Sequence, residues 1–236
     1  MSDAAYTPSE KVENFLKAVY TLQQNSGRVS TNTLSDVLQI TAPSVTDMAQ
    51  RLVTSGLVDY QKYYGVLLTP AGEEIALRVL RRHRLIELYL VRELGYELHE
   101  VHTEAEELEH AVSERFIEAL AKKLGEPEFD PHGDPIPAAD GTFSEALPLI
   151  TLVDAPVPSY AKIAHINTSN PEMIQYLIDR GFRLDQSIQI IAQDPFEGPL
   201  TVCIEGEKRV IGYQAAECIG VLMLNEDEAL YFNQCV

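Results

Sequence analysis

Apolar residues in the first third of the chain recur first with a helical period and then with a strand period. One apolar stripe predicts a helix over about 9–24, and two shorter stripes predict helices over about 31–38 and 42–55. Alternating residues then predict two strands, 57–62 and 66–69, joined by a tyrosine-rich turn. Three helices followed by a small hairpin are typical of a winged helix-turn-helix.

The rest of the chain changes from helical to strand-like patterning. Two long apolar stripes predict helices over about 71–94 and 103–124, and Thr103 with Glu106 has the spacing of a capping box at the start of the second. Residues 125–143 are rich in Pro, Gly and Asp and predict a loop. Short β-type runs interrupted by one helix then predict a small β-barrel. The expected strands are 161–166, 187–192, 200–204 and 209–213, and the expected helix is 171–180.

These patterns together predict an α+β protein of several domains. We expect a winged helix-turn-helix DNA-binding domain over 1–72, a helical domain over 73–145 and a small β domain over 146–236. A chain of 236 residues is long enough for three compact units of this size.

The charge of the chain is strongly negative and unevenly distributed. The formal net charge is -18, which taken alone argues against a nucleic-acid partner because phosphates repel an acidic surface. Residues 1–85, however, hold nine Lys and Arg against eight Asp and Glu, whereas the remainder holds nine against twenty-eight. The near-neutral first part therefore remains compatible with DNA, and the acidic remainder is better suited to a cation.

The sequence gives no sign of export or membrane insertion. The first residues lack the basic and apolar regions of a signal peptide, and no apolar stretch is long enough to span a bilayer. We therefore expect a cytoplasmic protein without a membrane partner. The three cysteines lie near the C-terminus without the CxxC spacing of a zinc or redox site, so we expect them to be buried free thiols.

The predicted helix over 42–55 occupies the position of a recognition helix. In a helix-turn-helix, the early residues of this helix meet base edges in the major groove, and the wing can contact the backbone or the minor groove. Asp47 is unusual at a DNA surface; it could accept from a cytosine amine or face away. The candidate DNA-contacting residues are Pro43, Ser44, Thr46, Asp47, Gln50, Arg51, Lys62 and Tyr63. The alternative is an adaptor whose winged helix binds protein, which the small number of basic residues keeps open.

The two long predicted helices carry the most specific chemical signal. His83 and Glu87 are four residues apart and share a helix face. His102, Glu106, Glu109 and His110 fall on one face of the second predicted helix. Neutral imidazole and carboxylate groups suit Mn, Fe, Co, Ni and Zn, and the absence of a thiolate disfavours softer ions.

Two other interpretations of these residues fit them less well. A solvated acidic helix face would explain the glutamates, but it does not explain the histidines among them. A metalloenzyme would need an open coordination position and a substrate pocket, and the sequence offers no separate nucleophile motif. The residues therefore favour a metal site in a protein that is not an enzyme.

Four stretches together resemble the diphtheria toxin repressor family of iron- and manganese-dependent regulators. They are ITAPSVTDMAQRLVTSGLV, YYGVLLTPAGEEIALRVLRRHRLIELYL, EVHTEAEELEHAVSE and PHGDPIP, and the resemblance extends over nearly the whole chain. It implies a homodimer whose middle helices hold the metal ions, and a C-terminal SH3-like, FeoA-like β domain. It also implies a metal-activated repressor that binds a palindromic operator and controls metal-uptake genes.

The resemblance also implies the ligands. His83, Glu87 and His102 match one family site, and Glu106, Glu109 and His110 match the other. Iron-specialised members usually have cysteine where this chain has Glu106, and manganese-specialised members have glutamate. This exchange of sulfur for oxygen favours Mn(II), with Fe(II) as the second candidate and other divalent transition metals as substitutes in vitro.

The chain departs from the family pattern where the first helix and the β domain supply ligands. The first-helix position is Asn14, with Glu13 beside it, and either could serve through a side-chain oxygen. One turn further on, where manganese sensors can use a second acid, this chain has Lys17. In the β domain the matching place holds Asn170 and Met173, and Glu172 between them is the candidate ligand.

Overall fold

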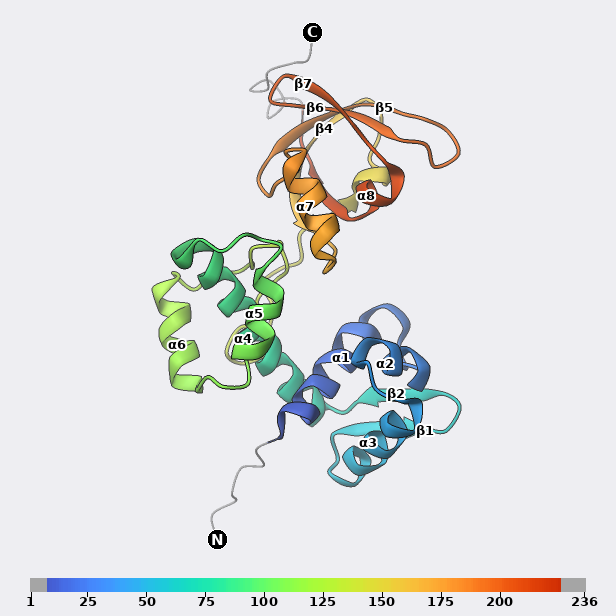
Figure 1. The fold of residues 1–236 in the computed structure, drawn as a ribbon, viewed down its shortest axis with the longest axis vertical. Coiled ribbons are helices and arrows are strands. Elements are labelled where there is room, and N and C mark those ends of the chain that lie inside the picture. Colours follow the sequence, from blue (N-terminus) through green and yellow to red (C-terminus); the bar gives the residue numbers. More distant parts are fainter. Residues whose placement is uncertain (1–7, 226–236) are drawn as a thin grey trace. The chain divides into compact units, whose positions relative to one another are not determined.

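A computed structural model describes residues 8–225, apart from the side chains of residues 25 and 26. The chain folds into two compact units. The first comprises Met1–His83, Leu108–Glu114 and Pro137–Thr142, and the second comprises Arg84–Glu107, Arg115–Ile136 and Phe143–Val236. Figure 1 shows the elements in sequence order by colour.

The first unit begins with the predicted winged helix-turn-helix. It contains α1 (Glu10–Ser26), α2 (Thr31–Leu38), α3 (Ala42–Thr54), β1 (Val58–Gln61) and β2 (Gly65–Leu68), and the two strands pair antiparallel. Its apolar stripes meet in one core. Phe15, Leu16 and Leu34 are its largest fully buried side chains.

Local chemistry explains the boundaries of these elements. The side chain of Thr41 accepts a hydrogen bond from the backbone N–H of Ser44 and so caps α3. Gly65 has φ 109°, and a Cβ there would collide with the carbonyl oxygen of Val29. Only glycine allows this approach, in which Val29 forms a β-bridge with Val66.

The helices that follow differ from the prediction at one point. α4 (Pro70–Leu94) matches the predicted helix, but the single helix expected over 103–124 is wrong. The chain instead forms α5 (Val101–Leu108), a turn, and α6 (Glu114–Lys123). Because α5 begins at Val101, Thr103 lies inside its first turn, and the predicted capping box is also wrong.

The physical reason for this break lies in the side chains of the turn. Glu109 is fully buried and bonded to residues of α1 and α4, so tertiary contacts override the helical periodicity there. Ser113, directly before α6, is a residue type favoured at helix starts and was the available sequence signal.

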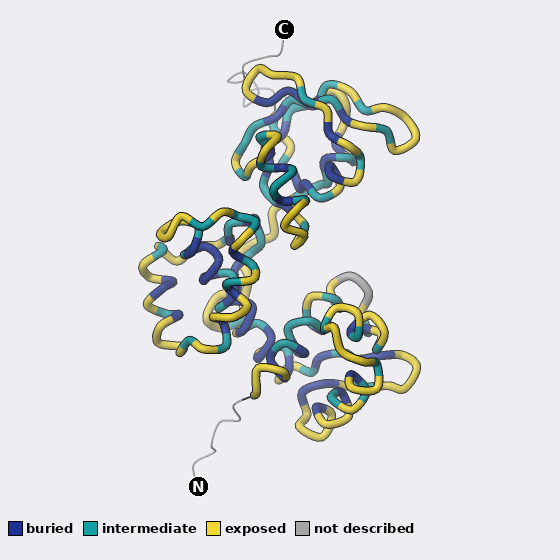
Figure 2. Tube along the Cα trace, in the orientation of Figure 1, coloured by how far each residue is buried: buried dark blue, intermediate teal, exposed yellow. Residues whose placement is uncertain are grey.

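The C-terminal part of the second unit is a six-stranded antiparallel sheet with strand order β3-β8-β4-β5-β6-β7. Its inward residues form a single core, and buried positions alternate with half-buried ones along parts of β4 and β5 (Figure 2). The elements are β3 (Ile150–Thr151), η1 (Leu152–Asp154), β4 (Ser159–Ile166), α7 (Pro171–Asp179), β5 (Ser187–Gln193), β6 (Leu200–Ile204), β7 (Glu207–Ile211), α8 (Tyr213–Glu217) and β8 (Ile219–Met223).

Most of this sheet follows the sequence prediction. Strands β4, β5 and β6 and helix α7 lie where they were expected, and β7 begins and ends two residues earlier than predicted. The prediction missed β3, α8 and β8. β8 pairs with both β3 and β4, so a short apolar run without alternation proves to be a buried strand of the sheet.

The loop before the sheet contacts β4 directly. The backbone N–H of Ile166 donates to the carbonyl of His132 at 2.8 Å. Gly133 has φ 90°, and a Cβ at this position would collide with the carbonyl oxygen of Ala164. His132 and Gly133, within the Pro- and Gly-rich loop predicted over 125–143, therefore pack against β4.

Two further expectations can be checked. Cys218 is a half-buried free thiol, but Cys203 is disulfide-bonded, so the prediction of free thiols is wrong for Cys203; Cys235 lies outside the described residues. Among residues 8–225, no helix is long and apolar enough to cross a membrane.

Candidate metal centre and nucleic-acid interface

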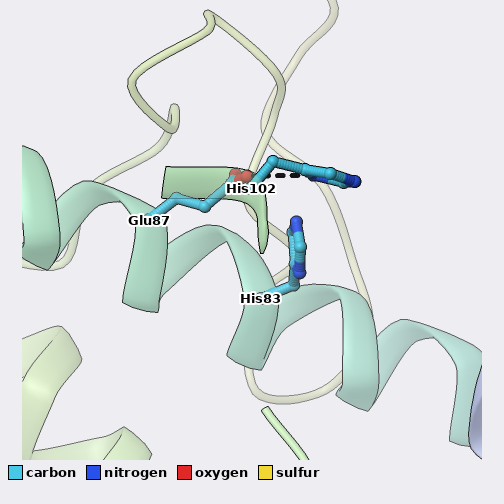
Figure 3. A group of neighbouring side chains, drawn as sticks. All are labelled: His83, Glu87 and His102. Carbon is cyan, nitrogen blue, oxygen red and sulfur yellow. Dashed lines mark hydrogen bonds and ion pairs between the residues drawn. The ribbon is translucent and has the colours of Figure 1, made fainter. Parts of the chain in front are cut away.

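One candidate group joins α4 to α5. His83 and Glu87 lie one turn apart on α4 and are both buried, and His102 lies on α5. One ligand atom from each of the three side chains lies within 4.8 Å of the others. Figure 3 shows the His83 ring pointing toward the other two side chains. We call these three residues the His102 group; two imidazoles and a carboxylate are a donor set that divalent transition metals accept.

Glu106 lies at the edge of this group. Its Oε1 atom is 3.7 Å from Nε2 of His102, one helical turn earlier on α5. About half of the Glu106 side chain is exposed, whereas Glu87 is almost completely buried.

A second candidate group joins α1 to the turn after α5. The carboxylate of Glu109 is fully buried, and its Oε2 atom lies 2.6 Å from Nδ1 of His83. His110 contacts α1 through both ring nitrogens, with Nδ1 2.6 Å from Oε2 of Glu13 and Nε2 2.8 Å from Oδ1 of Asn14. We call Glu13, Asn14, Glu109 and His110 the Glu109 group.

A lysine also belongs to this neighbourhood. Nζ of Lys17, on α1, lies 2.5 Å from Oε1 of Glu109, and the same oxygen lies 3.2 Å from Nε2 of His110. Burial raises the pKa of Glu109, but the hydrogen bond with His83 and the positive charge of Lys17 outweigh burial and lower it overall. Glu109 is therefore held as a carboxylate, the form that binds metal.

An arginine completes the links between these elements. Nη1 of Arg82, on α4, lies 3.3 Å from Oε1 of Glu13, and its guanidinium also pairs with Glu114 at the start of α6. Glu13 is thus bonded by Arg82 and His110 at once, which fixes the orientation of its carboxylate.

A set of polar residues in the PHGDPIP loop, and at Asp130 directly before it, was not predicted from the sequence. Nε2 of His132 lies 3.9 Å from Oε1 of Glu87, so the carboxylate of the His102 group has a second imidazole neighbour. Asp130 and Asp134 both pair with Arg84, and Nε2 of His165 on β4 lies 3.5 Å from Oδ2 of Asp134.

The pKa values of Asp130 and Asp134 are shifted in opposite directions. Burial raises the pKa of Asp130 well above its usual value, and the charges of Asp134 and Glu87 raise it further. Burial also raises the pKa of Asp134, but the hydrogen bond with His165 and the charge of Arg84 outweigh it and lower that pKa overall. A histidine and two acids within five residues of a proline-rich stretch were the signal that could have found this set.

The predicted DNA-contacting residues of α3 share one exposed face. Pro43, Ser44, Asp47, Gln50 and Arg51 are exposed, and the opposite face of the helix is buried in the core. Such a face is what a recognition helix presents to a major groove.

Three of the candidate side chains have partners within α3. Thr46 is half-buried, and its hydroxyl donates to the carbonyl of Ala42. Asp47 forms an exposed ion pair with Arg51, with 3.3 Å between Oδ2 and Nε. The pair offsets the negative charge that Asp47 would otherwise bring to a DNA surface.

The wing presents a cation and two aromatic rings. Tyr63 and Tyr64, in the turn between β1 and β2, are 91% and 73% exposed. Nζ of Lys62 lies 5.1 Å from the centre of the Tyr63 ring. Exposed aromatic groups beside a lysine at a hairpin tip are suited to contact with a nucleic-acid backbone.

Glu172, the candidate ligand from the β domain, lies at the start of α7. It lines an open cleft of the C-terminal sheet together with Tyr176, Glu197 and Tyr213. Its backbone N–H donates to the side chain of Asn170, which caps α7.

Three known protein families match successive parts of the chain. The iron dependent repressor N-terminal DNA binding domain matches residues 8–66, and the iron dependent repressor metal binding and dimerisation domain matches residues 69–138. A FeoA domain matches residues 150–223.

Individual relatives agree with these matches. The diphtheria toxin repressor of Corynebacterium diphtheriae is 27% identical over 207 residues, which cover 84% of this chain and 90% of the relative. The HTH-type transcriptional regulator MntR of Lysinibacillus sphaericus is 32% identical over 114 residues, or 48% of this chain and 81% of the relative. A solved manganese-dependent transcriptional repressor in complex with manganese is 38% identical, with a TM-score of 0.83 over 90% of this chain and 100% of that chain.

The chain belongs to the diphtheria toxin repressor family. This membership confirms the predicted fold class, with a winged helix-turn-helix, a helical metal-binding and dimerisation domain and an SH3-like FeoA domain. The diphtheria toxin repressor family consists of metal-dependent transcriptional repressors and not of enzymes, which confirms the function class predicted from the sequence.

Proposed function

We propose that this chain is a manganese-activated repressor, with Fe(II) as the second candidate ion. It acts in the cytoplasm as a homodimer on a palindromic operator and controls genes for metal uptake. Support comes from the manganese-dependent repressor structure and from the iron-dependent repressor domains that match the chain. The proposed division of roles is DNA binding by residues 1–72, metal binding and dimerisation by 73–145, and a supporting β domain over 146–236.

The observation that carries this proposal is the contact of His110 with α1. Its ring nitrogens lie 2.6 Å from Glu13 and 2.8 Å from Asn14. One imidazole of the turn after α5 therefore contacts two oxygen donors of the winged helix-turn-helix. The four side chains of the Glu109 group offer a carboxylate from each side, an amide oxygen and an imidazole. This donor set fits Mn(II) or Fe(II).

Each element has a distinct part in the proposed mechanism. Glu109 and His110 hold the ion from the turn after α5, and Glu13 or Asn14 holds it from α1. When bound, the ion supplies positive charge and coordination bonds that link these two segments. The link fixes α1 and, through the shared core, the orientation of α3 and its DNA-facing residues.

The choice of Mn(II) rests on the donor atoms. Glu13, Asn14, Glu106 and Glu109 offer oxygen, and the candidate groups contain no cysteine. Oxygen-rich sites suit the harder ion, whereas thiolate ligands favour softer metals.

A DNA-selection experiment tests the function. Genomic fragments from the source of the chain are selected on the purified protein with Mn(II), and operator affinity is then measured by fluorescence anisotropy with Mn(II), Fe(II), Zn(II) or chelator. We expect tight binding with Mn(II) or Fe(II) and binding at least about ten-fold weaker with chelator. Equal affinity with and without chelator would overturn metal activation, and failure to select any fragment would favour the protein-binding adaptor.

A further inference from the structure

The side chain of Lys17 is bonded within the proposed metal-binding group. Its Nζ atom lies 2.5 Å from Oε1 of Glu109, and the two side chains are 15% and 0% exposed. A salt bridge in such a place is an uncommon use of lysine, because burying an ammonium is costly unless it is closely paired. Lys17 therefore occupies one of the two carboxylate oxygens of Glu109 with a close, largely buried ion pair.

The other bonds of Glu109 show why this oxygen matters. Oε2 is bonded to Nδ1 of His83 at 2.6 Å, whereas Oε1 also faces Nε2 of His110 at 3.2 Å. His110 is the residue that meets Glu13 and Asn14 of α1. Oε1 is thus the oxygen of Glu109 that faces His110. It is also the oxygen to which Lys17 is bonded.

We propose that Lys17 is a tethered competitor for the divalent ion at Glu109 and sets the metal concentration at which the site fills. This inference rests on the proposed function, which places the ion in the Glu109 group. Binding of the ion through Oε1 requires the ammonium of Lys17 to give up its bond. Because Lys17 belongs to α1, it stays nearby after it is displaced, and its positive charge opposes the incoming cation.

The competition has a second consequence for α1. Glu13 and Asn14 are adjacent in α1, and Lys17 lies one helical turn later. All three side chains are bonded to the turn after α5. Metal binding would therefore replace the bond between Lys17 and Glu109 by coordination through Glu13 or Asn14. Lys17 lowers the net free energy gained when an ion binds, and the site therefore fills at a higher metal concentration.

Replacement of Lys17 by methionine tests the proposal. Methionine is close to lysine in length and removes the charge. Mn(II) binding to the full chain is measured from the electron paramagnetic resonance signal of free Mn(II), without DNA. We expect Lys17→Met to bind Mn(II) about ten-fold more tightly, since the fraction of molecules with a free Glu109 oxygen rises. Lys17→Arg, which keeps the charge, is expected to stay close to the unsubstituted protein.

Lys11→Met is the matched control, because Lys11 is an exposed lysine of the same helix. It is expected to leave Mn(II) affinity unchanged. Thermal unfolding of chelator-treated protein provides the second readout, in which Lys17→Met is expected to unfold at a lower temperature because Glu109 has lost a partner. If Lys17→Met folds poorly, Lys17→Gln carries the same expectation for Mn(II) affinity.

The outcomes separate this inference from the proposed function. Weaker Mn(II) binding by Glu109→Gln together with unchanged or weaker binding by Lys17→Met would overturn the competitor role and leave the metal site standing. Unchanged binding by both variants would overturn both, because Glu109 would then not be a ligand. A purely structural Lys17 would lower the unfolding temperature without tightening metal binding, which also contradicts the proposal.

Discussion

Nδ1 of His83 lies 2.6 Å from Oε2 of Glu109, so α4 and the turn after α5 meet at a fully buried carboxylate. His83 is also a member of the His102 group. One imidazole therefore adjoins both candidate metal groups, and substitutions in either group are expected to influence the other.

Glu109→Gln removes the charge of this carboxylate with little change in size. We expect Mn(II) affinity to fall at least about ten-fold, because an amide is a much weaker ligand than a carboxylate for a divalent cation. The measurement is Mn(II) titration of the purified protein. Glu107→Gln, at an exposed position two residues earlier on α5, is the matched control and is expected to bind normally. Normal binding by Glu109→Gln would remove Glu109 from the ligand set.

The DNA-facing role of α3 is tested by the double substitution Ser44→Ala and Gln50→Ala. Both residues are exposed, and loss of their polar groups is expected to reduce operator affinity at least about ten-fold, corresponding to one or two lost base or phosphate contacts. Mn(II) affinity should persist. Ser55→Ala, beyond the end of α3, serves as the control. Unchanged operator affinity in the double variant would contradict the assigned recognition face.

Thr41→Ala tests the N-cap of α3. The hydroxyl of Thr41 accepts from the N–H of Ser44, and its removal is expected to lower the free energy of unfolding of the winged helix by about 1 kcal/mol. Urea unfolding followed by circular dichroism measures this loss, and Thr41→Ser should restore most of it. A loss of the same size in Thr41→Ser would show that the methyl group, rather than the cap, is responsible.

Asp130→Asn tests the buried acid directly before the PHGDPIP loop. Because burial raises the pKa of Asp130, the folded protein holds this proton more tightly than the unfolded chain, and stability falls as pH rises from the usual pKa of 3.8 through the raised value. Asparagine does not ionise and so does not lose stability in this way. Its Oδ1 atom can still accept hydrogen bonds from the N–H groups of His132 and Asp134.

The expected result is a stabilising effect of Asp130→Asn that grows with pH through that window and is largest at neutral pH. Thermal unfolding of the variant and of the unsubstituted protein at several pH values measures it. A stability difference that is independent of pH, or that shrinks as pH rises, would show that Asp130 is charged in the folded protein.

The sequence predicted the winged helix-turn-helix well because its signals are local. The apolar stripe of α2 and the cap at Thr41 each depend on a few neighbouring residues, and the predicted and observed bounds agree. The break between α5 and α6 could not be predicted in this way. It depends on Glu109 being bonded to Lys17 and His83, which are 92 and 26 residues away in the sequence.

The candidate site shows the same division. Helical spacing was enough to single out His83, Glu87 and His102 as candidate ligands, and the family resemblance assigned the three to one site. The spacing argument for one continuous helix placed Glu109 and His110 on the same face as His102, whereas they lie in a turn. The part played by His132 depends on a loop that packs against β4, and no local pattern reports such packing.

The central claim is that His110 couples metal binding to DNA binding through α1. The most direct measurement is operator affinity, with and without Mn(II), for the unsubstituted protein, His110→Ala and the control His99→Ala. We expect Mn(II) to tighten operator binding at least about ten-fold in the unsubstituted protein and in His99→Ala, and to leave His110→Ala unaffected. An equal gain from Mn(II) in His110→Ala would contradict the account.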